Sequence, residues 1–415
     1  MNYIEKVFYD LVKNNPSLKF AVRNTYQFFF DLLPRQKNIF SGKYELREGY
    51  FFGFHDVSPF DSTTTRLLAN KLTIPNRMPL KGEELIVGYF PFDNGEMGEF
   101  VECGTSLAWN YHKGCRLQWL DNDRIVYNTA VNDSPAARIT DVSSGKSSFL
   151  DFPVDAVSYG GKMATSFSYE RLEELMPGYG YANYKDDSYL DLNMPEETGL
   201  FLADIDNNTK TLLVSLKELA DEANVDDDSM YHYVTHTEFS HDNRYISFLH
   251  RWVGKDRQKR SSRLVIYDLQ EKIFFPLPTD LMASHYVWNK KNQIVAYCRV
   301  NGKDGHFVFG LEPEIKTSCA TTEINSDGHQ TFISDSVFIT DTYPDRRRMA
   351  HLLRVDMGSE AVKKLASVYS PKKFQTKDFK KHIACDLHPR CSPDGRFVCF
   401  DTVFSGVRGI CVMSL

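Results

Sequence analysis

The chain has 415 residues, of which 42% are hydrophobic and 25% charged, a composition typical of a globular protein and unlike that of a disordered or collagen-like chain. Its formal net charge of −6 gives no general attraction to nucleic acid, so we expect no nucleic-acid partner. The eight cysteines include no CxxC pair, which excludes a zinc ribbon and favours buried free thiols.

No apolar run reaches the roughly 18 residues that a membrane span requires. The first residues also lack the apolar core and the small-residue cleavage site of a signal peptide. Together with the free thiols, these features predict a cytoplasmic location.

Residues 1–42 differ from the rest of the chain and are expected to form a helical appendage. Apolar residues from Ile4 to Val12 recur at helical spacing, and a second stripe runs from Leu18 to Leu33 before Pro34. We expect both stripes to pack on the remainder of the protein or on a second subunit. The alternative is peripheral docking to the inner membrane, because the second stripe has the apolar face of an interfacial helix.

Short β-type runs separated by turn residues fill residues 43–415, and they carry an internal repeat. HTEFSHDNRYISFLHR, HQTFISDSVFITDT and HPRCSPDGRFVCFDT align from their first residue, and weaker copies occur elsewhere. The repeats begin at positions 55, 116, 155, 236, 285, 329 and 388. Their spacing is that of propeller blades with loop insertions, so the sequence predicts an all-β fold, a single seven-bladed β-propeller. The longest insertion, between residues 160 and 235, is expected to hold a short helix around Ser215–Ala223.

After His388 the chain has room for only about three strands of ordinary length, the last of them GICVMSL. A closed ring needs a further strand there, because an open sheet edge leaves backbone groups unpaired. The segment KYELREGYF, Lys43–Phe51, is predicted to supply it, which gives seven four-stranded blades.

The stretches FSHDNRYISF and CSPDGRFVCF resemble the repeat of TolB-type propellers. More narrowly, HTEFSHDNRYISFLHR, SDGHQTF with TDTYPD, and DLHPRCSPDGRFVCFDT resemble the oligogalacturonate lyase group, with the ulvan lyase propellers a looser match. Members of that group are seven-bladed propellers that cleave uronic-acid polymers by β-elimination around a metal held by histidines. The resemblance implies metal ligands at His329 and His388. Where the group has another histidine this chain has Asp386, itself a suitable ligand for a divalent cation such as Mn²⁺, Ca²⁺ or Mg²⁺.

Five of the twelve histidines occupy the first position of a repeat. Pseudo-rotational symmetry places equivalent positions at one height and one radius, so we expect these side chains to converge at one mouth of the channel. The alternative is that each histidine caps a turn between blades through its ring nitrogens. The five residues are His55, His236, His285, His329 and His388.

β-Elimination on a uronate needs a group that neutralises the carboxylate, a base for the C5 proton and an acid for the leaving oxygen. We expect the metal or an arginine to fill the first role, and a histidine or a tyrosine to move the proton. The candidate catalytic residues are His236, Tyr343, Arg390 and Arg299. The candidate substrate-binding residues are His55, Arg116, His285, Arg251 and Trp252.

An anionic oligosaccharide or polysaccharide is the expected partner. It suits the predicted basic hairpin loop Arg251–Arg263 and the tyrosine-rich segment Tyr179–Asp191, whose rings can stack on sugars. Trp-Asp dipeptides, Asp-boxes and the G-x-S-x-G motif are absent, which argues against WD40, sialidase and prolyl-oligopeptidase propellers. Two interpretations stay open: a lyase acting on uronic-acid-containing glycans, and a non-catalytic propeller that binds a glycan or a protein in the assembly of bacterial surface polysaccharide.

Overall fold

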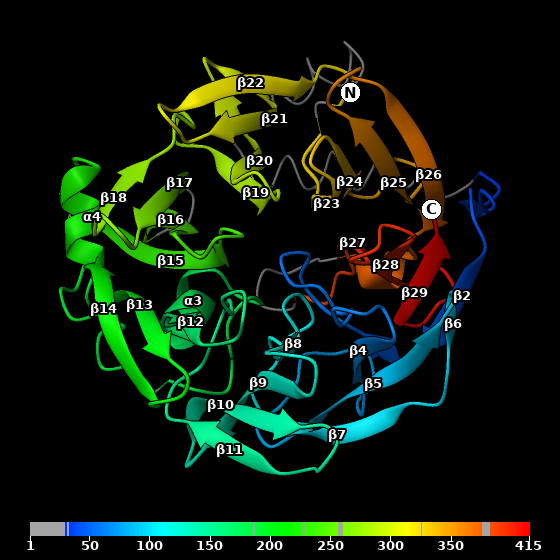
Figure 1. Cartoon of the computed structure of the whole chain (residues 1–415), viewed down its shortest axis with the longest axis horizontal. Coiled ribbons are helices and arrows are strands. Elements are labelled where there is room, and N and C mark those ends of the chain that lie inside the picture. Colours follow the sequence, from blue (N-terminus) through cyan, green and yellow to red (C-terminus); the bar gives the residue numbers. More distant parts are fainter. Residues whose placement is uncertain are drawn as a thin grey trace.

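The computed structural model describes residues 30, 33–185, 187–225, 227, 229–255, 260–324, 326–375 and 382–415. Seven sheets stand around a central axis as the blades of a β-propeller, and the chain visits them in sequence order (Figure 1). The all-β class and the number of blades are those that the repeat predicts. The helices predicted for the N-terminal appendage lie almost wholly outside the described residues.

The first three blades are formed by residues 50–215. The first blade comprises β3 (Tyr50–Phe51), β4 (Arg66–Lys71), β5 (Leu85–Asp93), β6 (Glu96–Met97) and β7 (Val101–Ser106). The second comprises β8 (Gln118–Trp119), β9 (Arg124–Val131), β10 (Ser134–Asp141) and β11 (Ser147–Leu150). The third has β12 (Met163–Ser166), β13 (Gly199–Asp204) and β14 (Thr209–Ser215).

The fourth and fifth blades have four strands each. The fourth comprises β15 (Met230–Phe239), β16 (Tyr245–Gly254), β17 (Arg260–Asp268) and β18 (Ile273–Pro276). The fifth comprises β19 (Ala283–Trp288), β20 (Gln293–Val300), β21 (Lys303–Gly310) and β22 (Lys316–Thr321).

The sixth and seventh blades each take a strand from near the N-terminus. The sixth comprises β23 (Thr331–Ser334), β24 (Val337–Asp341), β25 (Met349–Asp356), β26 (Val362–Tyr369) and the added β1 (Ile39–Phe40), and a 3-10 turn, Lys372–Phe374, follows it. The seventh comprises β27 (Arg390–Cys391), β28 (Phe397–Thr402), β29 (Gly409–Ser414) and the added β2 (Tyr44–Glu48).

The predicted ring closure is confirmed, with two corrections. β2 pairs antiparallel with β29, from Tyr44 opposite Met413 to Glu48 opposite Gly409. The end of the predicted segment does not belong to this strand, because the chain turns at Gly49, whose φ is +84°, and β3 starts the first blade. Ile39–Phe40, assigned from sequence to the appendage, pairs with β26 and so lies within the propeller.

The blades are also less uniform than the four strands that the sequence predicts. The third has three strands, because the segment after its repeat start pairs with β12 only through an isolated bridge, Val157 with Ala164. From β14 the chain continues into a helix, α4 (Leu216–Glu222), on the outer side of the ring (Figure 1). Ser215 and Glu218 form a capping box at its start, and the helix lies where the sequence predicts it. The other helix, α3 (Tyr169–Leu175), lies closer to the axis and starts the long insertion.

Neighbouring blades cover each other's faces, so central strands are buried along their whole length. β16 and β28 have no exposed residue, and one core cluster joins the sixth and seventh blades through Leu352, Ala366 and Phe400. All eight cysteines are free, as predicted, and six of them are buried, whereas Cys103 is partly exposed and Cys319 is exposed. Among the described residues no helix is long and apolar enough to cross a membrane.

Candidate active site

Among the residues that begin the seven repeats, Arg116, His329 and His388 stand two residues before the innermost strands β8, β23 and β27. The others lie near the innermost strand of their blade: His236 and His285 within β15 and β19, His55 after β3, and Asp155 before β12. Three of these seven residues, Arg116, His236 and His388, have left-handed backbone conformations with φ of 56°, 54° and 45°. Such a conformation costs a non-glycine residue about 1–2 kcal/mol. It persists at equivalent positions of three blades because the surrounding contacts hold it.

The five repeat-start histidines converge, as the sequence predicts, but their centre is filled by an aromatic ring. Phe54 is only 2% exposed, and it is surrounded by all five imidazoles. The distances from its ring centroid are 4.7 Å to His55, 4.7 Å to His236, 5.0 Å to His388, 5.7 Å to His329 and 5.8 Å to His285. We call these five residues the histidine ring. Nothing in the repeat pattern marks Phe54, which precedes the first repeat histidine by one residue.

The two repeat positions without histidine close the circle as an ion pair. Arg116 Nε lies 3.1 Å from Asp155 Oδ1, and Arg116 Nη1 lies 2.8 Å from Asp56. The buried Lys113 ammonium is 2.6 Å from Asp155. Although burial opposes ionisation, Arg116 and Lys113 hold the pKa of Asp155 well below its usual value. Arg116, predicted to contact substrate, is therefore engaged inside the protein.

Carboxylates orient three of the ring histidines. Asp341 accepts from the backbone N–H of His329 at 2.8 Å and from that of His388 at 3.0 Å, and its carboxylate lies 2.9 Å from His329 Nδ1. His285 Nδ1 lies 3.0 Å from Asp327 in the same way. Burial lowers the pKa of His285, whereas Asp341 raises that of His329 in spite of burial. The rings of His329 and His388 are 4.2 Å apart.

Beside the ring, three side chains could hold a metal ion. His112, Asp386 and His388 each offer one ligand atom, and these atoms all lie within 4.8 Å of one another. His112 Nδ1 and His388 Nε2 are sealed from solvent and have no hydrogen-bond partner among the described residues. Burial, with Asp341 nearby, raises the pKa of Asp386 to about 6. Two imidazoles and a carboxylate suit a divalent transition metal, so the donors fit such an ion.

This cluster, called the metal triad below, contains two of the three predicted ligands. His329 stands next to it, with an unpartnered Nε2, but His112 takes the third place. His112 lies in the loop between β7 and β8, outside the repeat register, so no periodicity points to it. Its ring stacks on Tyr179 of the insertion, with centroids 4.7 Å apart and planes at 17°. Tyr179 belongs to the segment singled out from sequence for its tyrosines.

Two predicted arginines make ion pairs within the chain. Arg390 is buried, pairs with Asp401 at 3.2 Å and donates to the carbonyl of Gly53 at 2.5 Å. Asp401 in turn accepts from the backbone N–H of Gly53, so this pair anchors the segment that carries Phe54. Arg299 pairs with Asp304 on the neighbouring strand at 2.6 Å and is partly exposed. The Arg390 guanidinium is therefore committed to an internal pair, whereas Arg299 forms a pair at the protein surface.

Arg251 and Trp252 face opposite sides of β16, as alternate residues of a strand do. The buried Arg251 donates to Ser262 at 2.9 Å, and with burial its charge lowers the pKa of His236. Trp252 instead packs on His232 and His250, with ring centroids 5.7 and 5.1 Å away. The structure therefore places Arg251 near the histidine ring and Trp252 outside it, in a separate buried cluster.

The two predicted proton-transfer residues differ in accessibility. Tyr343 follows β24, is 45% exposed, and has its ring 6.0 Å from that of His329. Although the ring is partly exposed, desolvation and the carboxylates of Asp327 and Asp386 raise the pKa of Tyr343 above its usual value, so its hydroxyl is protonated at neutral pH. His236 is buried, its Nδ1 lies 2.9 Å from Thr235 Oγ1, and its Nε2 is sealed.

The fold is shared with proteins of known structure, although no family model matches the chain. The curated proteins also contain no match. An oligogalacturonate lyase in complex with manganese superposes with a TM-score of 0.63 at 11% identity, over 92% of this chain and 98% of that one. An oligogalacturonate lyase from Vibrio parahaemolyticus gives 0.56 at 11% identity, over 92% and 98%. The tricorn protease gives 0.50 at 12%, over 89% of this chain and 33% of its own. These similarities establish the seven-bladed fold.

Proposed function

We propose that this protein cleaves uronic-acid-containing oligosaccharides by β-elimination at the histidine ring, with a divalent cation bound by His112, Asp386 and His388. The observation that carries the proposal is the metal triad, in which two sealed imidazole nitrogens have no partner among the described residues. The likeness in fold to a lyase in complex with manganese supports it. When bound, the cation would neutralise the substrate carboxylate and thereby acidify the C5 hydrogen.

His285 is the base in this proposal. Asp327 is 3.0 Å from its Nδ1 and accepts a second hydrogen bond from Ser284 Oγ at 2.6 Å, which fixes the carboxylate. The proton of His285 therefore resides on Nδ1, and Nε2 is left unprotonated. Nε2 of His236, by contrast, is sealed from solvent. His285 thus takes the C5 proton in place of His236.

Tyr343 completes the reaction as the acid. As His285 removes the C5 proton, the C4–O4 bond breaks, a C4–C5 double bond forms, and the departing O4 takes the Tyr343 hydroxyl proton. Tyr343 carries this proton at neutral pH, because its pKa lies above its usual value. Its partial exposure leaves the ring accessible to a substrate.

The test is metal analysis of the purified protein followed by incubation with oligogalacturonate, with the absorbance of the unsaturated product as readout. We expect one equivalent of a divalent metal, turnover by the unmodified protein, and loss of both in His388→Ala. His241→Ala is the matched control, since His241 stacks on Tyr159 at 4.4 Å outside the triad. A fully loaded protein that forms no unsaturated product from any uronate would rule out the lyase.

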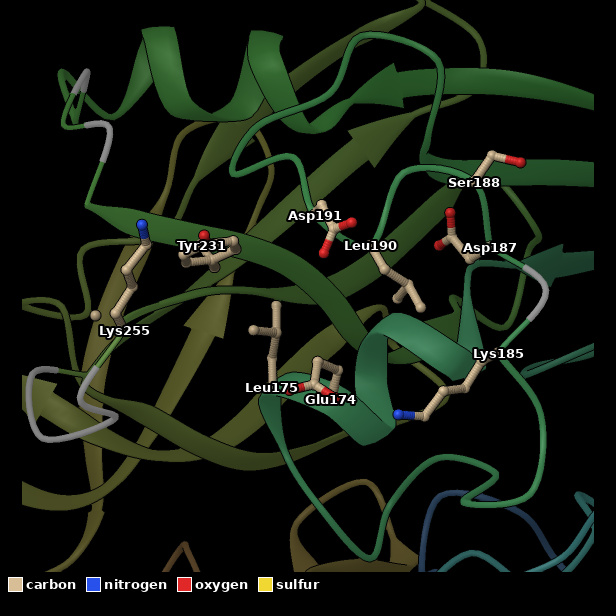
Figure 2. Close-up of a pocket in the computed structure, with 10 residues that line it drawn as sticks. Glu174, Leu175, Lys185, Asp187, Ser188, Leu190, Asp191, Tyr231 and Lys255 are labelled. Carbon is tan, nitrogen blue, oxygen red and sulfur yellow. The ribbon is translucent and has the colours of Figure 1, made fainter.

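A second candidate function, glycan binding without catalysis, is favoured by a pocket of about 610 Å³ beside α3 (Figure 2). Leu175 and Tyr231 give it apolar surface, while Asp191, Lys185 and Lys255 supply polar groups. Such a mixture suits a hydroxyl-rich ligand. If the lyase assay fails, binding of the same oligosaccharides, measured by calorimetry and lost in Tyr231→Ala, would support this function.

The loop of residues 189–193, which lines part of this pocket, is held in place by one buried side chain. Arg171 of α3 donates to the carbonyls of Tyr189 at 3.0 Å and of Leu192 and Asn193 at 2.8 Å each. It also donates to the carbonyl of His232 on β15 at 2.6 Å. The pocket walls are therefore preformed, as a binding site requires. The cytoplasmic location and an anionic glycan as partner stay predictions.

A further inference from the structure

We propose that His382 is a positioning residue for the metal triad: it binds Nε2 of His112 and so directs the unprotonated Nδ1 of His112 toward Asp386 and His388. This inference rests on the proposed metal site and adds a residue that does not itself bind the metal. The hydrogen bond between His112 Nε2 and His382 Nδ1 is its starting observation.

Other contacts fix where the His112 ring lies but not which nitrogen is protonated. Asn110 Oδ1 accepts from the backbone N–H of His112 at 3.0 Å and of Lys113 at 2.7 Å, which holds the loop. Stacking on Tyr179 fixes the plane of the ring. A rotation of the ring by 180° about its Cβ–Cγ bond would keep this plane but exchange the positions of nitrogen and carbon atoms. A contact to one specific ring nitrogen is therefore needed to fix the orientation.

His382 provides that contact. Its ring meets His112 edge to face, with centroids 4.0 Å apart and planes at 79°. A neutral imidazole has one donor and one acceptor nitrogen, so a proton on His112 Nε2 that is donated to His382 leaves Nδ1 as the ligand atom. In the other tautomer Nδ1–H would face Asp386 Oδ2 at 3.8 Å, beyond hydrogen-bond distance. The geometry therefore favours the metal-binding tautomer.

Gly178 leaves room for this arrangement. Its φ is +92°, and a Cβ at this position would stand 2.4 Å from Cβ of His382. Any side chain there must displace His382, because the two clashing atoms are both Cβ atoms, whose positions are fixed by the backbone. Gly178 and Tyr179 are consecutive, so one turn of the insertion both accommodates His382 and stacks on His112.

The test compares His382→Ala with His382→Asn, whose Oδ1 occupies the place of Nδ1 and can accept the same hydrogen bond. Binding of Mn²⁺ alone is measured by electron paramagnetic resonance of the free ion, and folding by thermal denaturation. Removing such a supporting residue typically weakens metal binding by about 10–100-fold. We expect that loss in His382→Ala and in Gly178→Ala, and recovery of most of the affinity in His382→Asn.

A second measurement does not depend on metal or on the stability of one variant. In ¹⁵N-histidine spectra of the metal-free protein, we expect His112 to carry its proton on Nε2, and to lose this preference in His382→Ala. Unchanged Mn²⁺ affinity in His382→Ala, or equal losses in the Ala and Asn variants, would overturn this inference alone. If the unmodified protein binds neither Mn²⁺ nor Zn²⁺, the proposed metal site and this inference both fail.

Discussion

Replacing Phe54 with alanine tests whether the histidine ring is organised around this side chain. Phe54 is 2% exposed, and its ring centroid lies 4.7–5.8 Å from the ring centroids of the five histidines. Burying a phenylalanine contributes about 1.5–3 kcal/mol by transfer from water alone. The cavity left inside the ring adds to this, so we expect Phe54→Ala to lower the free energy of unfolding by about 3–5 kcal/mol. That is a large share of the roughly 5–15 kcal/mol that stabilises a typical domain.

The assay is urea unfolding followed by the fluorescence of the four tryptophans. Phe54→Leu, which keeps much of the apolar volume, should cost less than about 1.5 kcal/mol. Phe149→Ala is the control, because Phe149 is 48% exposed and should change stability by less than about 0.5 kcal/mol. A loss below about 1 kcal/mol in Phe54→Ala would refute the reasoning, since the imidazoles would then not depend on the central ring.

Three further predictions concern stability. Burial lowers the pKa of His55, His236 and His250 well below 6.5, so the unfolded chain binds protons first as the pH falls. The free energy of unfolding should therefore be at its full value above about pH 6.5, and should fall below that pH by about 1.4 kcal/mol per pH unit for each such histidine. Urea titrations at pH 7.5, 6 and 5 measure this, and a free energy that does not change with pH would contradict it. Mn²⁺ at about 100 times its dissociation constant should stabilise the protein by about 2.7 kcal/mol in thermal denaturation, and His388→Ala should abolish the effect. Deleting residues 1–48 removes β1 and β2 and exposes the edges of two blades, so we expect aggregation and a lower melting temperature. Deleting only residues 1–32 should leave the propeller intact. If the full chain binds liposomes and this shorter deletion does not, membrane docking by the appendage would be supported.

The sequence by itself determined the architecture, because a repeat that recurs seven times can bury its faces only by stacking blade on blade. The strand that closes the seventh blade was predictable for the same reason, since a missing strand leaves an unpaired edge, which residues 44–48 of the predicted segment Lys43–Phe51 fill. The convergence of the five repeat-start histidines also follows from the repeat. Equivalent positions in a ring of blades lie at one height and radius, whatever their partners.

Only the tertiary structure decided what each of these side chains does. His112 and His382 come from connections outside the repeat, so no register relates them to Asp386 and His388. Arg390, a candidate catalytic residue from the sequence, has its charge paired with Asp401 eleven residues later.

The third repeat along the chain, which begins at Asp155, shows the same limit. It is hard to see in sequence because an aspartate stands where five other repeats have histidine, and Arg116 pairs with this aspartate only once the ring is closed. Pairing between charged groups and the filling of a central space by Phe54 depend on atoms brought together from distant parts of the chain. The local sequence pattern therefore determines where a residue lies around the propeller axis. Its protonation state, its ion-pair partner and its accessibility to a ligand depend on packing between distant parts of the chain.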